Sequence, residues 1–443
     1  MPLDIAPFQA RRARLLQTMQ EAGGGVAIIP TAPERIRNRD THHGYRFDSY
    51  FYYLSGFREP EAVLVLVAGD APKSLLFCRS KDIEREIWDG YRHGPDAARE
   101  AFGFDEAHPI AELDAKLAEL LLNQPTIFYS MGYEPDWDRR LTDALNRVRA
   151  QARSGHQAPA QIRDVRGLID EMRLVKDDSE IATMRRAAAI TAGAHRRAML
   201  TARHGAWEHE LEAELLHEFR RHGSQSPAYG SIVASGPNAC VLHYVENDRQ
   251  MQHGELILID AGCELDGYAS DITRSFPVNG RFSGPQKAVY ELVLAAQAAA
   301  IDKVRPGLDW NAAHDAATRV LAQGFLDLGL LQGSLDGVLE SGSYRQFYMH
   351  RTGHWLGLDV HDAGSYQTGG QWRLLTPGNV LTVEPGAYIR PAEGVPEAFW
   401  NIGVRIEDNV LVTPEGHDII TIATPKTITE IEALMREAPH AQA

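Results

Sequence analysis

Residues 256–276, LILIDAGCELDGYASDITRSF, decide the fold of the second half of this chain. An apolar run ends at Asp260, and Asp266-Gly267 then predicts a two-residue β-hairpin turn, because glycine tolerates the positive φ that such turns require. With these two residues at the centre of the turn, position 260 lies opposite position 273. Asp271 is two residues from that partner, so it shares a face of the hairpin with Asp260, at a Cα separation of ~7 Å.

Two aspartates on one face at that separation repel each other. They are stable together when a positive group lies between them, and a divalent cation is the natural candidate. The alternative for the hairpin taken alone is a pair of solvated charges near a turn. The hairpin therefore predicts either a metal site or a turn at which one or both carboxylates are exposed.

Residues 349–362, MHRTGHWLGLDVHD, contain His350, His354 and His361. The spacing of the first two invites comparison with the helical HExxH zinc motif. The comparison fails because position 351 is arginine, and because Gly353 and Gly357 disfavour a helix. We expect a strand or loop here, in which the histidines are either site residues or side chains satisfied by packing.

Two glutamates lie in otherwise apolar segments with strand-like patterns. Glu384 is in VLTVEPGAYI, residues 380–389, and Glu407 is in VRIEDNVLV, residues 404–412. A buried carboxylate must be paired, neutralised or bound to a metal. Arg405 is two positions from Glu407 and shares its face of the predicted strand, so an ion pair is the alternative to metal binding there.

The composition limits the broad class of protein. A chain of 443 residues with 44% apolar and 24% charged residues is typical of two or three globular domains. The formal charge of −15 argues against a nucleic-acid or anionic-membrane binder, because both need basic surface. The three cysteines, none in a CxxC pair, argue against a disulfide framework. With neither a signal-peptide pattern nor an apolar run long enough to span a bilayer, we expect a cytoplasmic protein.

The hydrophobic patterns divide the chain into two predicted domains. Residues 1–164 are expected to form an α/β domain, with buried strands at 26–29, 62–67 and 75–77 and a helix at 110–123. The polar segment 151–164 is the predicted linker.

Residues 165–443 are expected to form an α+β domain, because helical and strand patterns occur in blocks. Asp177 and Glu180 form a capping-box pattern at the first helix. Helices are expected at 177–201, 207–222, 284–304 and 310–328, and strands dominate 231–276 and 380–412.

The carboxylates and histidines together resemble a known ligand pattern. The order Asp260, Asp271, His354, Glu384, Glu407 resembles that of the metallopeptidases with the pita-bread fold, which include methionine aminopeptidases, prolidases and aminopeptidases P. No ligand position departs from the pattern. The segments that are similar to aminopeptidase P are NACVLHYVENDRQ, LIDAGCELDGYASDITRSFPVNG, HRTGHWLGLDVHD, TVEPGAYI, GVRIEDNVLVT and, near the N-terminus, FYYLSGFREPEAVLVLV.

This resemblance covers nearly the whole chain and implies its fold. It implies an α+β pita-bread (creatinase/aminopeptidase) catalytic domain preceded by an α/β domain that is Rossmann- or ribonuclease-H-like. It also implies two divalent metal ions. Asp260 would bind one, Asp271 and Glu407 would bridge both, and His354 and Glu384 would complete the other site. A hard, oxygen-rich ligand set favours Mn²⁺, although Zn²⁺ or Co²⁺ can also occupy it.

The resemblance implies roles for the remaining candidates. His243 and His361 would bind the substrate and stabilise the charge that develops on the scissile carbonyl. Glu384 would move a proton from the attacking water to the leaving nitrogen. His350 and Arg405 would position the ligands or the substrate.

The implied activity is hydrolysis of the first peptide bond in peptides with proline in second position, with release of the first residue. The nearest alternative is a prolidase, which cleaves Xaa-Pro dipeptides. The spacing of 23 residues from Glu384 to Glu407 is similar to that in aminopeptidases P, whereas prolidases tend to carry a longer insertion between the two glutamates. A methionine aminopeptidase fits the long N-terminal domain poorly.

A non-catalytic peptide-binding protein of the same fold is the alternative from another class, and the intact ligand set opposes it. The expected partners are proline-containing peptides and further copies of this chain in a dimer or tetramer. The resemblance also implies that the N-terminal domain helps to enclose the site of a neighbouring copy, and Trp88 is a candidate for that wall.

Overall fold

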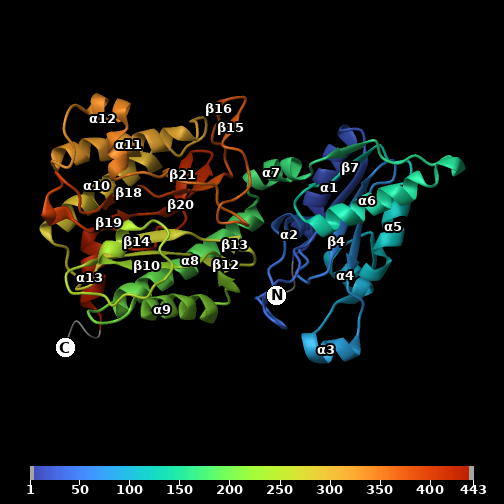
Figure 1. The fold of residues 1–443 in the computed structure, drawn as a ribbon, viewed down its shortest axis with the longest axis horizontal. Coiled ribbons are helices and arrows are strands. Elements are labelled where there is room, and N and C mark those ends of the chain that lie inside the picture. Colours follow the sequence, from blue (N-terminus) through green and yellow to red (C-terminus); the bar gives the residue numbers. More distant parts are fainter. Residues whose placement is uncertain (1–3, 439–443) are drawn as a thin grey trace. The chain divides into compact units, whose positions relative to one another are not determined.

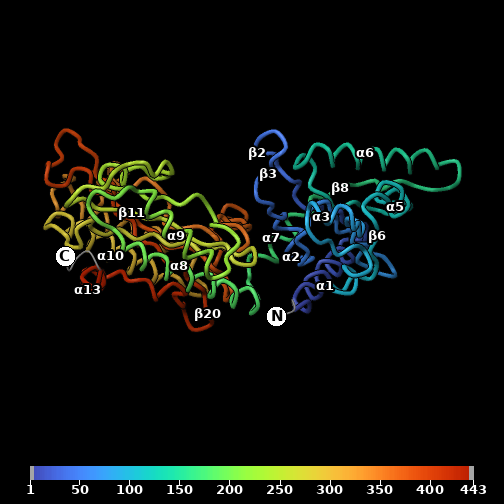
Figure 2. Tube along the Cα trace, turned by 90° about the horizontal axis from the view of Figure 1, so that it is seen from below, coloured from blue at the N-terminus to red at the C-terminus, as the bar shows by residue number. Residues whose placement is uncertain are grey.

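The computed structural model describes residues 4–438 of the chain (Figures 1 and 2). Its contacts divide the chain into two units, Met1–Arg173 and Leu174–Ala443. Helix α7 (Arg166–Leu174) therefore belongs almost wholly to the first unit, whereas the sequence assigns the residues after 164 to the second. Among residues 4–438, no helix is both long and apolar enough to cross a membrane.

The first unit is built on a six-stranded sheet in the order β6-β5-β4-β1-β7-β8. The strands are β1 (Gly25–Pro30), β4 (Val63–Ala68), β5 (Lys73–Cys78), β6 (Glu106–Pro109), β7 (Thr126–Phe128) and β8 (Gln161–Arg163). The three predicted strand runs are thus confirmed. Strand β4 is antiparallel to both of its neighbours, while the other pairs are parallel. This mixed sheet excludes the all-parallel Rossmann alternative and fits the ribonuclease-H-like one.

Helices cover both faces of this sheet. Leu117 of α5 and Leu141 and Leu145 of α6 pack with Val26 and Val65 on one face, and α6 and α1 lie on opposite sides of the strands in Figure 2. The helices are α1 (Ala6–Glu21), α2 (Ser49–Ser55), α3 (Ile83–Asp89), α4 (Gly94–Phe102), α5 (Leu113–Leu120) and α6 (Pro135–Arg149), with 3-10 turns η1 (Ile110–Glu112) and η2 (Ala152–Ser154) and a small hairpin of β2 (Ile36–Asn38) and β3 (Thr41–His42).

The segment 151–164, predicted as a linker, contains strand β8 at the edge of the sheet. Strand β8 pairs in parallel with β7, from Gln161 opposite Thr126 to Arg163 opposite Phe128. All three residues of β8 are exposed. An edge strand that is exposed on both faces does not need alternating apolar and polar residues. The polar composition of this segment was therefore indistinguishable from that of a linker.

The second unit places strands between two pairs of helices, α8–α9 and α10–α11, which Figure 1 shows on opposite sides of the strands. The helices are α8 (Asp178–Thr201), α9 (Glu208–Arg221), α10 (Gly284–Ile301), α11 (Asn311–Asp327), α12 (Leu335–Ser341) and α13 (Ile428–Arg436), with 3-10 turns η3 (Gly236–Cys240), η4 (Ser343–Gln346) and η5 (Glu397–Phe399). The four predicted helices are confirmed to within a few residues. The capping box is also confirmed, because the Asp177 carboxylate accepts from the backbone N–H of Glu180.

The strands of this unit form several small sheets: β10-β11-β14, β13-β12-β9, β17-β20-β21, β18-β19 and β15-β16. Their bounds are β9 (Ser226–Pro227), β10 (Ile232–Ser235), β11 (Leu256–Ala261), β12 (Cys263–Leu265), β13 (Tyr268–Ala269), β14 (Ile272–Pro277), β15 (Gln367–Thr368), β16 (Gln371–Trp372), β17 (Val380–Val383), β18 (Gly386–Ile389), β19 (Ile402–Arg405), β20 (Asp408–Thr413) and β21 (Gly416–Ile419).

The predicted hairpin register is confirmed. Asp260 lies opposite Thr273, and both Asp266 and Gly267 have the positive φ angles of the predicted turn, 51° and 85°. Gly262 lies where the chain passes from β11 to β12, and a Cβ there would lie 1.6 Å from the carbonyl oxygen of Ser270. Glycine is therefore required at this crossing.

Neither glutamate lies inside a strand as predicted. Glu384 falls between β17 and β18, and Glu407 falls between β19 and β20. Their backbone N–H groups donate to other segments, that of Glu384 to the carbonyl of Thr352 (2.7 Å) and that of Glu407 to the carbonyl of Thr273 (3.1 Å). Each apolar run is thus two short strands in different sheets, and each glutamate occupies the break.

A buried ion pair holds the segment around Glu407. The guanidinium of Arg274 donates to the Asp408 carboxylate at 2.7 Å, and both side chains are 0% exposed. The same guanidinium donates to the backbone carbonyls of Glu407 (2.6 Å) and Pro425 (3.0 Å). Burial raises the pKa of Asp408, but the charges of Arg274 and Lys426 outweigh it and lower the pKa overall.

Replacing this arginine tests its structural importance. Arg274→Met should lower the free energy of unfolding by ~3–5 kcal/mol, because it leaves a buried carboxylate and several carbonyls without their donors. Urea unfolding of the metal-free protein measures this, with the exposed Arg281→Met as the matched control, which should change it by less than ~0.5 kcal/mol. A loss below ~1 kcal/mol for Arg274→Met would contradict the assignment.

Candidate active site

One cavity in the second unit, of about 730 Å³, contains every residue that the sequence predicts for the site. These residues are His243, Asp260, Asp271, His350, His354, His361, Glu384, Arg405 and Glu407. They come from five stretches of the chain, and the sheet breaks described above bring them together.

The two hairpin aspartates converge on one tyrosine. Asp260 is near the end of β11 and Asp271 directly precedes β14. The hydroxyl of Tyr229 donates to Oδ1 of Asp260 at 2.6 Å and is also in hydrogen-bond contact with Oδ1 of Asp271. A phenol has one hydrogen, so it satisfies only one carboxylate at a time. The second carboxylate needs another positive partner.

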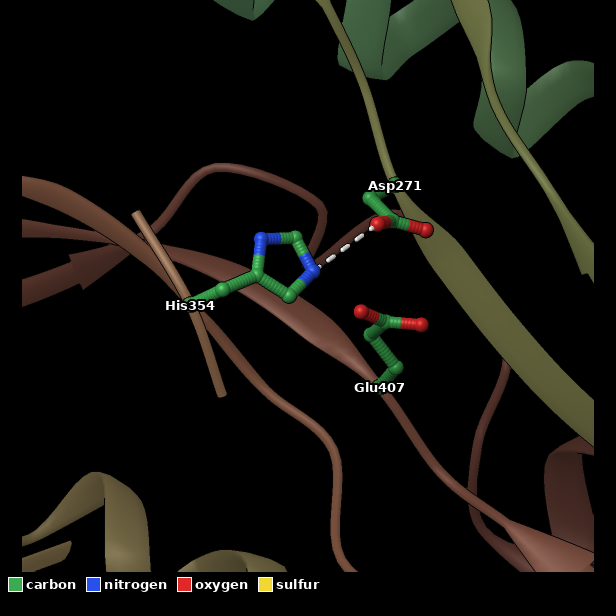
Figure 3. A group of neighbouring side chains, drawn as sticks. All are labelled: Asp271, His354 and Glu407. Carbon is green, nitrogen blue, oxygen red and sulfur yellow. Dashed lines mark ion pairs between the residues drawn. The ribbon is translucent and has the colours of Figure 1, made fainter. Parts of the chain in front are cut away.

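Asp271, His354 and Glu407 form the tightest cluster of possible metal ligands. Each offers one ligand atom, and these atoms all lie within 4.8 Å of one another. Figure 3 shows the three side chains pointing toward one another from separate segments. Nε2 of His354 lies 3.4 Å from Oδ2 of Asp271 and 3.6 Å from Oε1 of Glu384, so Glu384 adjoins this cluster.

The imidazole of His354 is oriented for a cation. Its Nδ1 lies 2.9 Å from the carbonyl oxygen of Trp355, which can only accept, so Nδ1 carries the hydrogen. The lone pair of Nε2 in the neutral ring then faces the oxygens of Asp271 and Glu384. A lone pair that faces carboxylates needs a proton or a metal ion between them.

Glu407 provides an independent sign of a missing positive partner. Its Oε2 accepts from the hydroxyl of Thr273 at 2.7 Å, but its Oε1 is buried without a hydrogen-bond partner. A buried carboxylate oxygen without a donor is costly. Divalent cations fit this cavity, because it is lined by four carboxylates (Asp260, Asp271, Glu384 and Glu407). Within residues 4–438, a guanidinium forms an ion pair with only one of them, Arg405 with Asp260.

The pKa shifts in the metal-free cavity agree with a site that binds cations. Burial raises the pKa of Glu384 to about 7, and burial together with Asp271 raises that of Glu407 well above its usual range. Burial also raises the pKa of Asp271, with a further contribution from Asp260. Burial lowers the pKa of His354, but the hydrogen bond to Asp271 and the charge of Glu384 outweigh it and raise the pKa to about 9.

Arg405 pairs with Asp260, not with Glu407 as the alternative interpretation proposed. Its Nη2 donates to Oδ2 of Asp260 at 2.7 Å. Arg405 and Glu407 do not share a strand face, because β19 ends at Arg405 and the next strand, β20, belongs to another sheet. The predicted ion pair within one strand is therefore wrong.

His350 is held by a chain of hydrogen bonds that begins at Arg405. Nη1 of Arg405 donates to the hydroxyl of Tyr388 (3.0 Å), and this hydroxyl donates to Nε2 of His350 (2.8 Å). Nδ1 of His350 donates to the carbonyl of Arg351 (2.7 Å). Burial, followed by the nearby Arg405 charge, lowers the pKa of His350 to about 3, so the ring is neutral at pH 7.

His243 and His361 lie at the exposed side of the cavity. The ring of His361 stands edge-on to that of His354, with centroids 4.4 Å apart. Burial, followed by the charge of His354, lowers the pKa of His361. His243 follows η3 in a loop that is anchored at the next residue, where the hydroxyl of Tyr244 donates to the buried carboxylate of Glu208 at 2.8 Å.

Tyr229 and Tyr388 were missed by the sequence analysis. Tyr229 is a single aromatic residue in the loop between β9 and β10, and Tyr388 is in the apolar strand β18. No spacing or charge pattern distinguishes either one from a packed tyrosine. Only the contacts of their hydroxyl groups reveal them.

Comparison with known families gives the class of the protein. Residues 182–414 match metallopeptidase family M24, and residues 8–129 match the aminopeptidase P N-terminal domain. The chain belongs to metallopeptidase family M24.

Known relatives narrow the group within this family. The Xaa-Pro aminopeptidase of Escherichia coli is 45% identical over 97% of both chains. The structure of the Pseudomonas aeruginosa aminopeptidase PepP matches with a TM-score of 0.97 at 51% identity, over 99% of both chains. A zinc-substituted form of E. coli aminopeptidase P in complex with product matches with a TM-score of 0.96 at 44% identity, also over 99% of both.

Within the family, the chain is therefore one of the Xaa-Pro aminopeptidases, also called aminopeptidases P, and it is a hydrolase. The predicted family is confirmed, as is the pita-bread domain preceded by a separate N-terminal domain.

Removing the shared hydroxyl of Tyr229 tests its link to the metal ligands. Tyr229→Phe should weaken Mn²⁺ binding about 10- to 100-fold, because a donor that orients two ligands is lost. Competition with a fluorescent chelator measures the affinity. Tyr53→Phe, which removes a buried hydroxyl in the first unit, should leave the affinity unchanged. Equal affinities of Tyr229→Phe and wild type would contradict this role.

The raised pKa of His354 predicts a pH dependence of stability. Its folded-state pKa of about 9 exceeds its ordinary 6.5, so the folded metal-free protein binds more protons than the unfolded chain between these values. The stabilisation is complete below pH 6.5 and is lost as the pH rises to 9. His195, His314 and His350 have lowered pKa values and are mostly neutral in both states above pH 7. The raised pKa values of Glu384 and Glu407 also make the folded protein bind more protons than the unfolded chain, so they act in the same direction as His354.

Urea unfolding of chelator-treated protein should therefore show a loss of ~2 kcal/mol between pH 7 and pH 9. The loss should be smaller in His354→Asn. Saturating Mn²⁺ should also reduce it, because the metal replaces the proton on Nε2. Stability that rises over this window in the metal-free wild type would be inconsistent with the assignment.

Proposed function

We propose that the protein removes the first residue from peptides with proline in second position, by metal-dependent hydrolysis of the Xaa-Pro bond. The observation that carries the proposal is the cluster of Asp271, His354 and Glu407, with its unpartnered Glu407 oxygen, inside a cavity large enough for a short peptide. The high identity to Xaa-Pro aminopeptidases over the whole chain supports the choice of substrate.

We assign the two metal positions to five ligands. Asp260 would hold one ion, Asp271 and Glu407 would contribute to both positions, and His354 and Glu384 would complete the second position. Four carboxylates and one imidazole are hard ligands, which supports Mn²⁺ as the native metal. Two divalent cations held there would lower the pKa of a water molecule and would offset the charge of the buried carboxylates.

The side chains around the metal positions transfer the proton, stabilise the developing charge and position the substrate. Glu384 takes a proton from the attacking water and delivers it to the proline nitrogen, which leaves as a secondary amine. His243 and His361, at the exposed side, donate to the scissile carbonyl oxygen as charge develops there. His350 and Arg405 act as positioning residues, because both are fixed in the hydrogen-bond chain through Tyr388.

We further propose a cytoplasmic homo-oligomer. The three cysteines are buried and free, which supports a reducing compartment. Helix α3 and the segment after it expose Ile83, Ile87, Trp88 and Tyr91 by 76%, 78%, 84% and 92%. Large apolar side chains grouped on a surface mark a protein contact. This group supports assembly of a dimer or tetramer.

The products of two peptides test the proposal. Mn²⁺-loaded protein is incubated with an Xaa-Pro-Yaa tripeptide and with an Xaa-Pro dipeptide, and the products are identified by mass spectrometry. We expect release of free Xaa from the tripeptide. The Asp271→Ala variant should show neither turnover nor full metal loading, because it lacks a bridging ligand.

The outcomes separate the alternatives. Cleavage of the dipeptide alone would make the protein a prolidase with the same ligands. Cleavage of neither peptide by metal-loaded protein would support a peptide-binding role instead. Turnover and full metal content in Asp271→Ala would overturn the ligand assignment.

A further inference from the structure

Two arginines line the cavity, and the environments of their guanidinium groups differ. Arg405 has every nitrogen engaged: Nε donates to Thr273, Nη1 to Tyr388 and Nη2 to Asp260. It is 3% exposed. Arg405 is therefore largely inaccessible to a ligand, and each of its three nitrogens already donates to a protein group.

Arg351 is exposed in the same cavity and has free donors. Its Nη2 donates to the side-chain oxygen of Asn311, and its guanidinium lies over the ring of Trp372, 5.0 Å from the centroid. Within residues 4–438, no protein group accepts from its Nε or Nη1, and no carboxylate pairs with it. A solvent-exposed cation with N–H groups that no protein group accepts from can bind an anionic ligand in this cavity.

The position of Arg351 is fixed from two sides. Its backbone carbonyl accepts from Nδ1 of His350, at the end of the hydrogen-bond chain from Arg405. Trp372 is half-buried against the core of the unit and lies on the β15–β16 hairpin. The turn of this hairpin is Gly369-Gly370, with φ angles of 60° and 79°. An aromatic support and a fixed backbone reduce the entropy lost when the guanidinium binds a ligand.

The charges of a short peptide match the cavity. The cavity is lined by the four carboxylates of the candidate metal site. It also has apolar lining from Leu242, Val360 and Trp310. A peptide with proline in second position has a cationic amino end, an apolar ring and, when it is short, one remaining charge, its terminal carboxylate. A planar guanidinium binds a carboxylate through two parallel hydrogen bonds.

We propose that Arg351, supported by Trp372, is a specificity-determining subsite that binds a carboxylate of the peptide beyond the proline. The inference rests on the proposed function and assigns a substrate class within it. The preferred substrates are short peptides whose C-terminal carboxylate reaches Arg351, or peptides with an acidic side chain at the same distance.

The test compares matched peptides that differ only in the C-terminal group. Xaa-Pro-Yaa and Xaa-Pro-Yaa-Yaa peptides are supplied as free acids and as amides, and kcat and KM are measured with Mn²⁺-loaded protein. For one of the two lengths, we expect the free acid to have about tenfold higher kcat/KM, mainly through a lower KM, because the contact is far from the reacting bond. Amidated peptides with glutamate at the third or fourth position distinguish a side-chain carboxylate from the terminal one.

Variants assign the preference to the proposed residues. Arg351→Ala should reduce the acid-to-amide ratio of kcat/KM to near one. Arg351→Lys and Trp372→Leu should each retain about a third of the acid-to-amide preference. The lysine keeps the positive charge but loses the planar guanidinium, and the leucine removes the aromatic ring that supports the guanidinium. Arg281→Ala, an exposed arginine outside the cavity, should keep the full ratio.

Equal rates for acids and amides in the wild type would overturn the inference while leaving the proposed function intact. The same holds if Arg351→Ala slows acids and amides equally, because that marks a structural role. Failure of the wild type to cleave any of the peptides would contradict the proposed function itself.

Discussion

Four carboxylates share one largely buried cavity, and the rest of this structure depends on how their mutual repulsion is balanced. Without a metal, burial raises the pKa of Asp271, Glu384 and Glu407, and His354 binds a proton more tightly than usual. The protein folds with these groups close together because strong local features fix the backbone around them. The metal-binding property follows from this arrangement, since cations relieve a repulsion that the fold imposes.

The backbone that carries the ligands is fixed by groups that touch no substrate. Arg274 and Asp408 form a buried pair next to Glu407 and hold the carbonyls on both sides of the strand break. Gly353 lets the chain pass so close to β17 that a Cβ would lie 2.0 Å from the carbonyl oxygen of Thr382. His354 then donates its backbone N–H to the hydroxyl of Thr382 at 3.0 Å. Close packing and backbone hydrogen bonds thus fix the positions of the candidate metal ligands.

The cavity also distributes its donors by function. The guanidinium of Arg405 is buried and donates from all three of its nitrogens to protein groups, whereas that of Arg351 is exposed and lies over the ring of Trp372. His350 accepts from Tyr388 and is neutral, while His243 and His361 remain exposed at the cavity. Residues of one type in the sequence therefore differ in how exposed they are and in whether their donors already bond within the protein.

The sequence by itself determined the local features. The turn residues Asp266-Gly267 set the hairpin register and so placed Asp260 and Asp271 on one face, and the capping box set the start of α8. These features depend on residues a few positions apart, whose conformational preferences act in any context. The family resemblance added the complete ligand set, because it compares many such positions at once.

Only the tertiary structure decided which distant groups meet. Arg405 pairs with Asp260, which is 145 residues away, rather than with Glu407 beside it. Tyr229 joins two aspartates, β8 is an edge strand rather than a linker, and Arg351 stacks on Trp372. Each of these depends on where the chain leaves one sheet for the next. Such breaks arise from competition between backbone partners far apart in sequence, and no local pattern encodes that competition.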